Sequence, residues 1–285
     1  MFPHRPGLGT SVAVKTLARA LIVVVAMATP LVPAIPQATA APTWAPAATA
    51  PIHPGVQTVT AGAQCTANFV FTSGTTVYIG QAAHCSGTGG NTETDGCTSG
   101  SLPIGTPVDV GGVATGTMVY NSWLTMQSVG ETDANTCAYN DLALIQLSAS
   151  DAAKVNPSIP FWGGPTSVGG GTALGDNVYS YGNSSLRLGL TQLSPKRGLS
   201  LGDDGGGWTH TVYTVTPGIP GDSGSAFLNA SGQAIGVLST VAIAPLAGSN
   251  GVGDLAHELA YLNSHTSMSV SLATGTEPFS TSRTL

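Results

Sequence analysis

The segment Pro220-Gly-Asp-Ser-Gly-Ser225 leads directly into the apolar run Ala226-Phe-Leu228. Glycine and proline favour a tight turn, because glycine accepts positive φ angles and proline holds φ near the value that a turn needs. A short apolar run after such a turn is typical of a buried strand. The segment therefore predicts that Ser223 lies in a tight turn with glycines close on both sides.

Two segments upstream of this turn carry a histidine and an aspartate. Gly80-Gln-Ala-Ala-His84 follows an expected strand that ends at Ile79, and Asn140-Asp141 leads into an apolar strand. A serine hydroxyl is a poor nucleophile unless a base takes its proton, and imidazole titrates close to neutral pH. A carboxylate can fix the tautomer of that imidazole and stabilise its charged form. The three segments together predict a catalytic group of His84 as base, Asp141 as its orienting acid and Ser223 as nucleophile.

Each of these residues also has an ordinary structural interpretation. The Ser223 segment could be a plain β-turn, His84 beside Cys85 could be a buried structural residue, and Asp141 could cap a turn before its strand. The occurrence of all three in one chain, each with its own local pattern, favours the catalytic interpretation.

The rest of the chain predicts many short strands and one helix. The strands are short apolar or alternating runs that glycine- or proline-bearing turns separate, as expected from 38 glycines and 19 prolines among 285 residues. Leu255, Leu259 and Leu262 share one face of a helix that follows the potential cap Asp254. The sequence therefore predicts an all-β fold that ends in a helix.

The composition excludes several classes of protein. The net charge is −6 and no basic run follows residue 19, so a nucleic-acid partner has no electrostatic basis. A hydrophobic fraction of 42% with a modest net charge argues against a disordered chain. His257-Glu-Leu-Ala-Tyr261 begins like the helix of a zinc protease, but Tyr261 occupies the position of the second histidine. No metal site is predicted.

In these segments and in the order His84, Asp141, Ser223, the sequence resembles the chymotrypsin-like serine proteases of the secreted bacterial type. The resemblance implies two six-stranded antiparallel Greek-key β-barrels with a C-terminal α-helix. The implied parts of the chain are a protease domain over about 59–265, with barrel one over about 59–160, barrel two over about 165–252 and the helix over about 254–264, and then a tail over 266–285.

The resemblance implies a serine endopeptidase that hydrolyses peptide bonds through an acyl-enzyme intermediate. Its partner would be a protein or peptide substrate, the protein would be a monomer, and no metal or organic cofactor is implied. The alternative is a binding protein on the same fold whose protease activity is latent or lost.

The resemblance also assigns roles to residues around Ser223. The backbone N–H groups of Gly221 and Ser223 would form the oxyanion hole. The substrate-binding residues would be Pro217, Ser239, Thr240 and Val241. None of these is acidic, so a pocket for lysine or arginine lacks its counter-charge, and small or medium apolar side chains before the scissile bond are favoured.

The acid beside the nucleophile, Asp222, pairs with an internal cation in bacterial proteases of this type. Arg187 is the expected partner here, and Lys196 and Arg197 are the alternatives.

Four cysteines, Cys65, Cys85, Cys97 and Cys137, follow the N-terminal segment. An even number in an exported chain favours two disulfides, for which three pairings are possible. The resemblance implies the pair Cys65–Cys85, beside the histidine, which leaves Cys97 to pair with Cys137.

The N-terminus has the pattern of an export signal. Basic residues up to Arg19 precede an apolar run over 20–28, and Ala38-Thr-Ala40 fits a small-residue cleavage site. The apolar run is too short for a membrane anchor. We expect a signal peptide over 1–40, an Ala/Pro-rich leader or short propeptide over 41–58, and a secreted, extracellular protein that is free of the membrane after cleavage.

Overall fold

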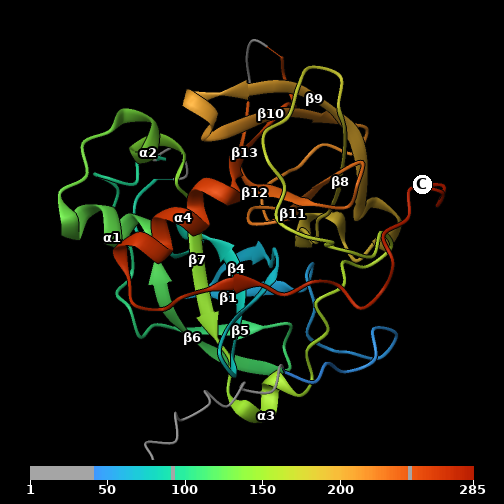
Figure 1. The fold of residues 1–285 in the computed structure, drawn as a ribbon, viewed down its shortest axis with the longest axis horizontal. Coiled ribbons are helices and arrows are strands. Elements are labelled where there is room, and N and C mark those ends of the chain that lie inside the picture. The colour runs from blue at the N-terminus through green and yellow to red at the C-terminus, as the bar shows by residue number, and fades with distance from the viewer. Residues whose placement is uncertain (1–41, 91–93, 243–245) are drawn as a thin grey trace, which may run out of the picture. The chain divides into compact units, whose positions relative to one another are not determined.

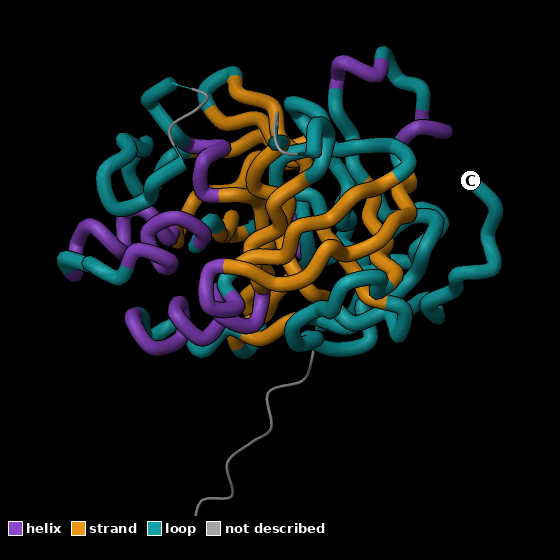
Figure 2. Tube along the Cα trace, turned by 90° about the horizontal axis from the view of Figure 1, so that it is seen from above, coloured by secondary structure: helices purple, strands orange, loops and turns teal. Residues whose placement is uncertain are grey.

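The computed structural model describes residues 42–90, 94–242 and 246–285, so the predicted signal peptide lies outside the described residues. The described chain has the two-barrel, all-β fold with a C-terminal helix that the sequence predicts (Figure 1). Figure 2 shows the strands at the centre and most of the helices toward one side.

The first sheet has eight antiparallel strands in the order β14-β3-β4-β7-β6-β5-β1-β2. This is two more than the six strands that the resemblance implies, and β14 is added to one edge by the C-terminal tail. The strands of the first sheet are β1 (Gln57–Thr60), β2 (Ala63–Thr66), β3 (Val70–Ser73), β4 (Thr76–Ala82), β5 (Pro107–Val110), β6 (Ala114–Asn121), β7 (Leu142–Gln146) and β14 (Ser271–Leu272).

Barrel two is a closed sheet of six strands in the order β10-β13-β12-β11-β8-β9. Its strands are β8 (Asn177–Tyr181), β9 (Pro195–Asp204), β10 (Thr209–Thr214), β11 (Ala226–Asn229), β12 (Ala234–Val241) and β13 (Asn250–Asp254). Alternate side chains point inward along each strand, and they form a small buried core of Val178, Val212, Phe227, Ile235, Leu238 and Val252.

The helices are short except for the last one. They are α1 (Ser122–Val129), α2 (Ala134–Tyr139), α3 (Ala149–Ala152) and α4 (Leu255–His265), with 3₁₀ turns η1 (Ala83–Ser86), η2 (Ser185–Arg187), η3 (Thr191–Leu193) and η4 (Gly205–Gly207). Helix α4 begins where the sequence predicts, because Asp254 caps it by accepting the His257 backbone N–H at 2.8 Å. Leu255, Leu259 and Leu262 are buried, as the predicted face requires.

A second core joins the two sheets. It contains Phe71 and Leu142 from the first sheet, Leu228 and Val237 from barrel two, and Leu255 from α4, all of them buried. This shared core places the ends of β4 and β7 against β12, and the candidate site is built at that junction.

The C-terminal tail crosses from the first sheet to barrel two. After α4 it adds β14 to β3, with Ser271 opposite Thr72, and then packs Phe279 on Tyr179 of β8 at 5.5 Å between ring centroids. The red strand in Figure 1 follows this course. The tail is therefore part of the packed structure on both sides of the junction.

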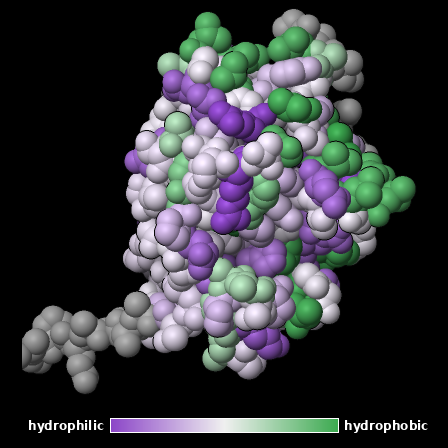
Figure 3. Space-filling model, turned by 90° about the vertical axis from the view of Figure 1, so that its right-hand side faces the viewer, coloured by the Kyte–Doolittle hydropathy of each residue, from purple (hydrophilic) through white to green (hydrophobic). Residues whose placement is uncertain are grey.

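The segment expected as a leader also packs against the fold, from residue 42 onward. Ile52 is fully buried and pairs with Val155, whose carbonyl accepts the Ala45 N–H at 2.9 Å. Figure 3 shows polar and apolar side chains interspersed on one face of the molecule. Over the described ranges, no helix has the length and apolar character needed to span a bilayer.

Candidate active site

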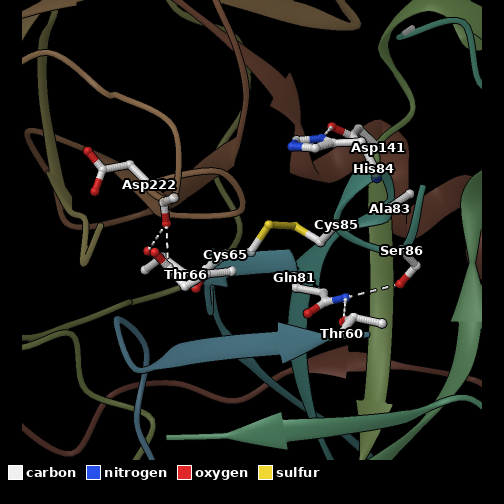
Figure 4. The surroundings of a disulfide bond; sticks show 12 residues. Thr60, Cys65, Thr66, Gln81, Ala83, His84, Cys85, Ser86, Asp141 and Asp222 are labelled. Atoms are coloured by element: carbon white, nitrogen blue, oxygen red, sulfur yellow. Dashed lines mark hydrogen bonds and ion pairs between the residues drawn. A yellow bond between two sulfur atoms is a disulfide. The ribbon is translucent and has the colours of Figure 1, made fainter. Parts of the chain in front are cut away.

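The β4–β7 ladder brings His84 and Asp141 together. Ala82 pairs with Leu142, and the Ala83 N–H donates to the Asp141 carbonyl at 2.9 Å, so both side chains lie at the same end of the ladder. His84 Nδ1 lies 2.6 Å from Asp141 Oδ2, and the His84 backbone N–H donates to Asp141 Oδ1 at 2.9 Å (Figure 4). Because a carboxylate only accepts hydrogen bonds, Nδ1 carries the proton and Nε2 is left free to act as a base.

Barrel two also contributes to the Asp141 carboxylate. The Ser239 hydroxyl donates to Asp141 Oδ2 at 2.5 Å, from a position on β12 where the pairing register with β13 shifts. Asp141 is buried, so these donors take the place of water around its carboxylate oxygens. The sequence predicted Ser239 as a substrate-binding residue, and the structure adds its contact with Asp141.

Asp141 perturbs the titration of His84. Burial lowers the pKa of the imidazole, whereas the charge of Asp141 and its hydrogen bond raise it, and the net effect is a pKa above the ordinary value of 6.5. Asp141 therefore stabilises the imidazolium form of His84, which is the form that a general base reaches when it accepts a proton.

A third carboxyl group, Glu258 of α4, lies behind Asp141. Its Oε1 accepts the Asp141 backbone N–H at 3.0 Å, and the side chain is fully buried. Burial raises the pKa of Glu258 well above its ordinary value, and the charges of Asp141 and Asp254 add to this. Sequence reasoning singled out Glu258 only within a failed zinc-binding pattern, because nothing local connects it to a residue 117 positions away.

Two consecutive turns present Ser223. Asp222 N–H donates to the Ile219 carbonyl at 2.8 Å around Pro220 and Gly221, whose φ of 92° needs a glycine. The second turn contains Gly224, where a Cβ atom would come within 2.5 Å of the Thr66 carbonyl. The backbone N–H groups of Gly221 and Ser223 donate to no group in the described ranges, so both are available to an incoming oxygen.

The Cys65–Cys85 disulfide connects the serine turn to the histidine. The Ser223 carbonyl accepts the N–H of Thr66 at 2.8 Å, and Thr66 follows Cys65, whose disulfide partner Cys85 follows His84. Figure 4 shows this disulfide between the His84–Asp141 pair and Thr66. The Ser223 hydroxyl itself makes no hydrogen bond to a described residue, His84 included.

Asp222 lies fully buried between two cations. Arg187 Nη2 is 2.6 Å and Lys196 Nζ is 2.9 Å from the same oxygen, Oδ2, and the Ser184 N–H donates to Oδ1 at 3.0 Å. Arg187 was the expected partner, and Lys196 joins it rather than replacing it. Arg197, the other alternative, lies over the ring of Tyr179 instead.

The predicted substrate-binding residues form two segments. The Pro217 carbonyl accepts a hydrogen bond from Arg187 Nη2 at 2.9 Å, so this segment is anchored to the cluster around Asp222. Thr240 and Val241 continue β12 beyond Ser239, and Val241 is 47% exposed.

Both disulfides have the expected pairing, Cys65–Cys85 and Cys97–Cys137. The two clusters of potential metal ligands in the described ranges each contain one of these disulfides, together with His84 or Asp95. Disulfide sulfurs are not thiolates, so neither cluster has the ligand set of a metal site.

No protein-family model and no curated protein matches the chain. Among solved structures, the chain is similar to Thermobifida fusca Protease A, with a TM-score of 0.51 and 17% identity over 79% of this chain and 99% of that one. It is also similar to Cellulomonas bogoriensis chymotrypsin (TM-score 0.48, 16% identity, 78% and 98% covered). A third match is a glutamic acid specific serine protease (TM-score 0.49, 16% identity, 78% and 100% covered). The first of these likenesses shows that the chain has the fold of a bacterial chymotrypsin-like serine protease.

Proposed function

We propose that this protein is a secreted serine endopeptidase that cleaves peptide bonds with His84, Asp141 and Ser223. The observation that carries the proposal is the buried Asp141 carboxylate, which holds His84 Nδ1 at 2.6 Å. A purely structural histidine would need neither this carboxylate nor the nearby Ser223 turn, whose Gly221 and Ser223 N–H groups donate to no described residue. The two disulfides of the described chain support an extracellular location.

The geometry suggests the following sequence of proton and bond changes. Ser223 Oγ attacks the substrate carbonyl carbon while His84 Nε2 takes the hydroxyl proton, and Asp141 stabilises the imidazolium. The N–H groups of Gly221 and Ser223 hold the oxyanion. His84 then protonates the leaving amine, which departs as the acyl-enzyme forms. A water molecule then gives a proton to His84 and attacks the ester carbon, and His84 returns that proton to Ser223 Oγ as the ester bond breaks and the acid is released.

The second candidate is a binding protein in which this machinery is latent or lost. The Ser223 hydroxyl, which has no hydrogen bond to His84, favours this alternative. Such hydrogen bonds are often long before substrate is present, so an assay is needed to decide.

The test is peptide-bond cleavage by the full-length protein after export into the culture medium. The substrate is a complex mixture of peptides, so that a protease of narrow specificity still finds a cleavable bond. The control is Ser223→Ala, prepared in the same way. New peptide ends with wild type and none with the variant are expected. Equal cleavage by both preparations, or none by correctly disulfide-bonded wild type, would contradict the proposal.

The rate of the reaction should depend on the protonation of His84. A base must be neutral, so kcat/KM is expected to be high above the His84 pKa and to fall as pH drops through it. Because Asp141 raises this pKa, the acid limb should be centred above pH 6.5. A pH–rate profile with a peptide substrate measures it, and a midpoint below 6.5 would mean that the His84–Asp141 pair does not govern catalysis.

A further inference from the structure

The edge of β12 that faces Ser223 is open beyond Leu238. Strand β11 pairs with β12 only as far as Val237, and the Leu238 carbonyl then accepts the Gly224 N–H of the serine turn at 2.7 Å. No strand in the described ranges pairs with that edge of residues 239–241. An unpaired edge is where an extended peptide can add as a further strand. A peptide bound there would direct the side chain before its scissile bond toward the space between this edge and the segment 217–219.

The Asn250 carboxamide occupies that space. Asn250 is the first residue of β13, lies opposite Val241 on one side and Val212 on the other, and is fully buried. Its Oδ1 accepts the Gly218 N–H at 2.8 Å. Its Nδ2 donates to the Gly218 carbonyl at 3.3 Å and to the Thr240 carbonyl at 3.1 Å. One side chain thus ties together the two segments that would flank the substrate side chain.

The contacts of Gly218 show how completely the space is filled. A Cβ atom at Gly218 would lie 2.7 Å from Leu238 Cδ1 and 2.9 Å from Asn250 Nδ2, both closer than van der Waals contact. Leu238 is itself 3% exposed and belongs to the core of barrel two. Opening a deep pocket here would need displacement of a core leucine or loss of three hydrogen bonds.

The chemistry of the filled space also selects against charged side chains. A carboxamide has two N–H donors, and both donors of Asn250 are engaged by carbonyl groups, so none remains for a substrate carboxylate. The nearby cations, Arg187 and Lys196, are already paired with Asp222. Asp222, which accepts the Ile219 N–H, is engaged by these two cations in turn, so its carboxylate is not free to receive a lysine or arginine.

We propose that Asn250 closes the specificity pocket, so that the protease cleaves after small uncharged residues such as alanine, serine or glycine. This inference rests on the proposed function, because it assigns a substrate class to the same site. Asn250 determines specificity in two ways: it fills the space that a large substrate side chain would need, and its own hydrogen-bonding groups are already engaged.

The test uses succinyl-Ala-Ala-Pro-X diphenyl phosphonates, in which X is alanine, phenylalanine, lysine or glutamate. These compounds phosphonylate an active serine and release phenol, and intact mass reports the rate without any need for turnover. Wild type should react about 100-fold faster with the alanine compound than with the phenylalanine compound, and more slowly still with the charged ones. Asn250→Ala should raise the rate for phenylalanine relative to alanine by about 10-fold.

Two further variants serve as controls, one for misfolding of Asn250→Ala and one for the effect of any substitution in this barrel. Asn250→Ser is used if the alanine variant does not fold, because its hydroxyl can still hydrogen-bond to the backbone of Gly218 or Thr240. It should shift the preference in the same direction as Asn250→Ala. Asn177→Ala, on the exposed surface of the same barrel, should leave the preference unchanged.

The results separate a failure of the Asn250 inference from a failure of the proposed protease function. If wild type reacts fastest with the phenylalanine, lysine or glutamate compound, Ser223 is active and only the inference is overturned. A folded Asn250 variant with an unchanged preference overturns the role of Asn250. If neither these compounds nor a small fluorophosphonate modifies Ser223, the proposed function fails and the inference fails with it.

Discussion

Replacing Asp141 with asparagine is expected to lower kcat by about 10⁴-fold while the fold is retained. The reason lies in the donors around the carboxylate: His84 Nδ1, the His84 backbone N–H and the Ser239 hydroxyl all point at it. An asparagine amide offers only one acceptor oxygen, so its NH₂ group must face one of these donors. His84 would then favour the wrong tautomer or turn away, and Nε2 could no longer take the serine proton.

The measurement is steady-state hydrolysis of a peptide substrate, with circular dichroism to show that the variant is folded. The matched control is Asp109→Asn, an exposed aspartate on β5 of the same sheet, which should keep wild-type kcat. A loss of less than about 10-fold in Asp141→Asn would mean that His84 does not act through this pair, because the wrong tautomer alone costs far more.

Replacing Asp222 with asparagine is expected to destabilise the protein by about 3–5 kcal/mol. The carboxylate is fully buried and is the shared counter-charge of Arg187 and Lys196, which are 8% and 0% exposed. Removing it leaves two buried cations without compensation, and this costs more than the ion pairs contributed. The Ile219 N–H also donates to Asp222 Oδ2 at 3.2 Å, so the turn that carries Gly221, a residue of the proposed oxyanion hole, should lose its support and activity should fall.

Urea denaturation followed by tryptophan fluorescence measures this loss. The matched control is Asp151→Asn, which removes the partner of Lys154 in a surface pair and should cost less than about 1 kcal/mol. Arg187→Met should cost less than Asp222→Asn, because Lys196 remains 2.9 Å from the carboxylate. Equal losses for Asp222→Asn and Asp151→Asn would contradict the role assigned to the buried cluster.

The sequence predicted those parts of the site that short segments encode. His84, Asp141 and Ser223 each lie in a local pattern of a strand end or a glycine turn, so their elements and chemistry could be inferred before any geometry was known. The resemblance supplied what the segments alone could not, namely the pairing of the cysteines and the two-barrel fold.

The contributions that the sequence did not predict come from residues that are distant in the chain and ordinary in type. Glu258 reaches Asp141 only because α4 packs at the junction of the two sheets. Lys196, which the sequence offered only as an alternative to Arg187, is a second partner of Asp222 because β9 pairs with β8 in barrel two. Asn250, at the start of β13, accepts the N–H of Gly218, which lies 32 residues earlier in the chain. Buried polar residues of this kind carry no local pattern, since tertiary packing alone determines their partners.

The most direct measurement of the central proposal is intact-mass analysis of the exported protein after treatment with a small fluorophosphonate, beside Ser223→Ala. A single adduct on wild type, located at Ser223 by peptide mapping and absent from the variant, is the predicted result, and its formation should slow as pH falls through the His84 pKa. No adduct on wild type in which both disulfides have formed would show that Ser223 is not an activated nucleophile, and would contradict the assignment of this protein as an active protease.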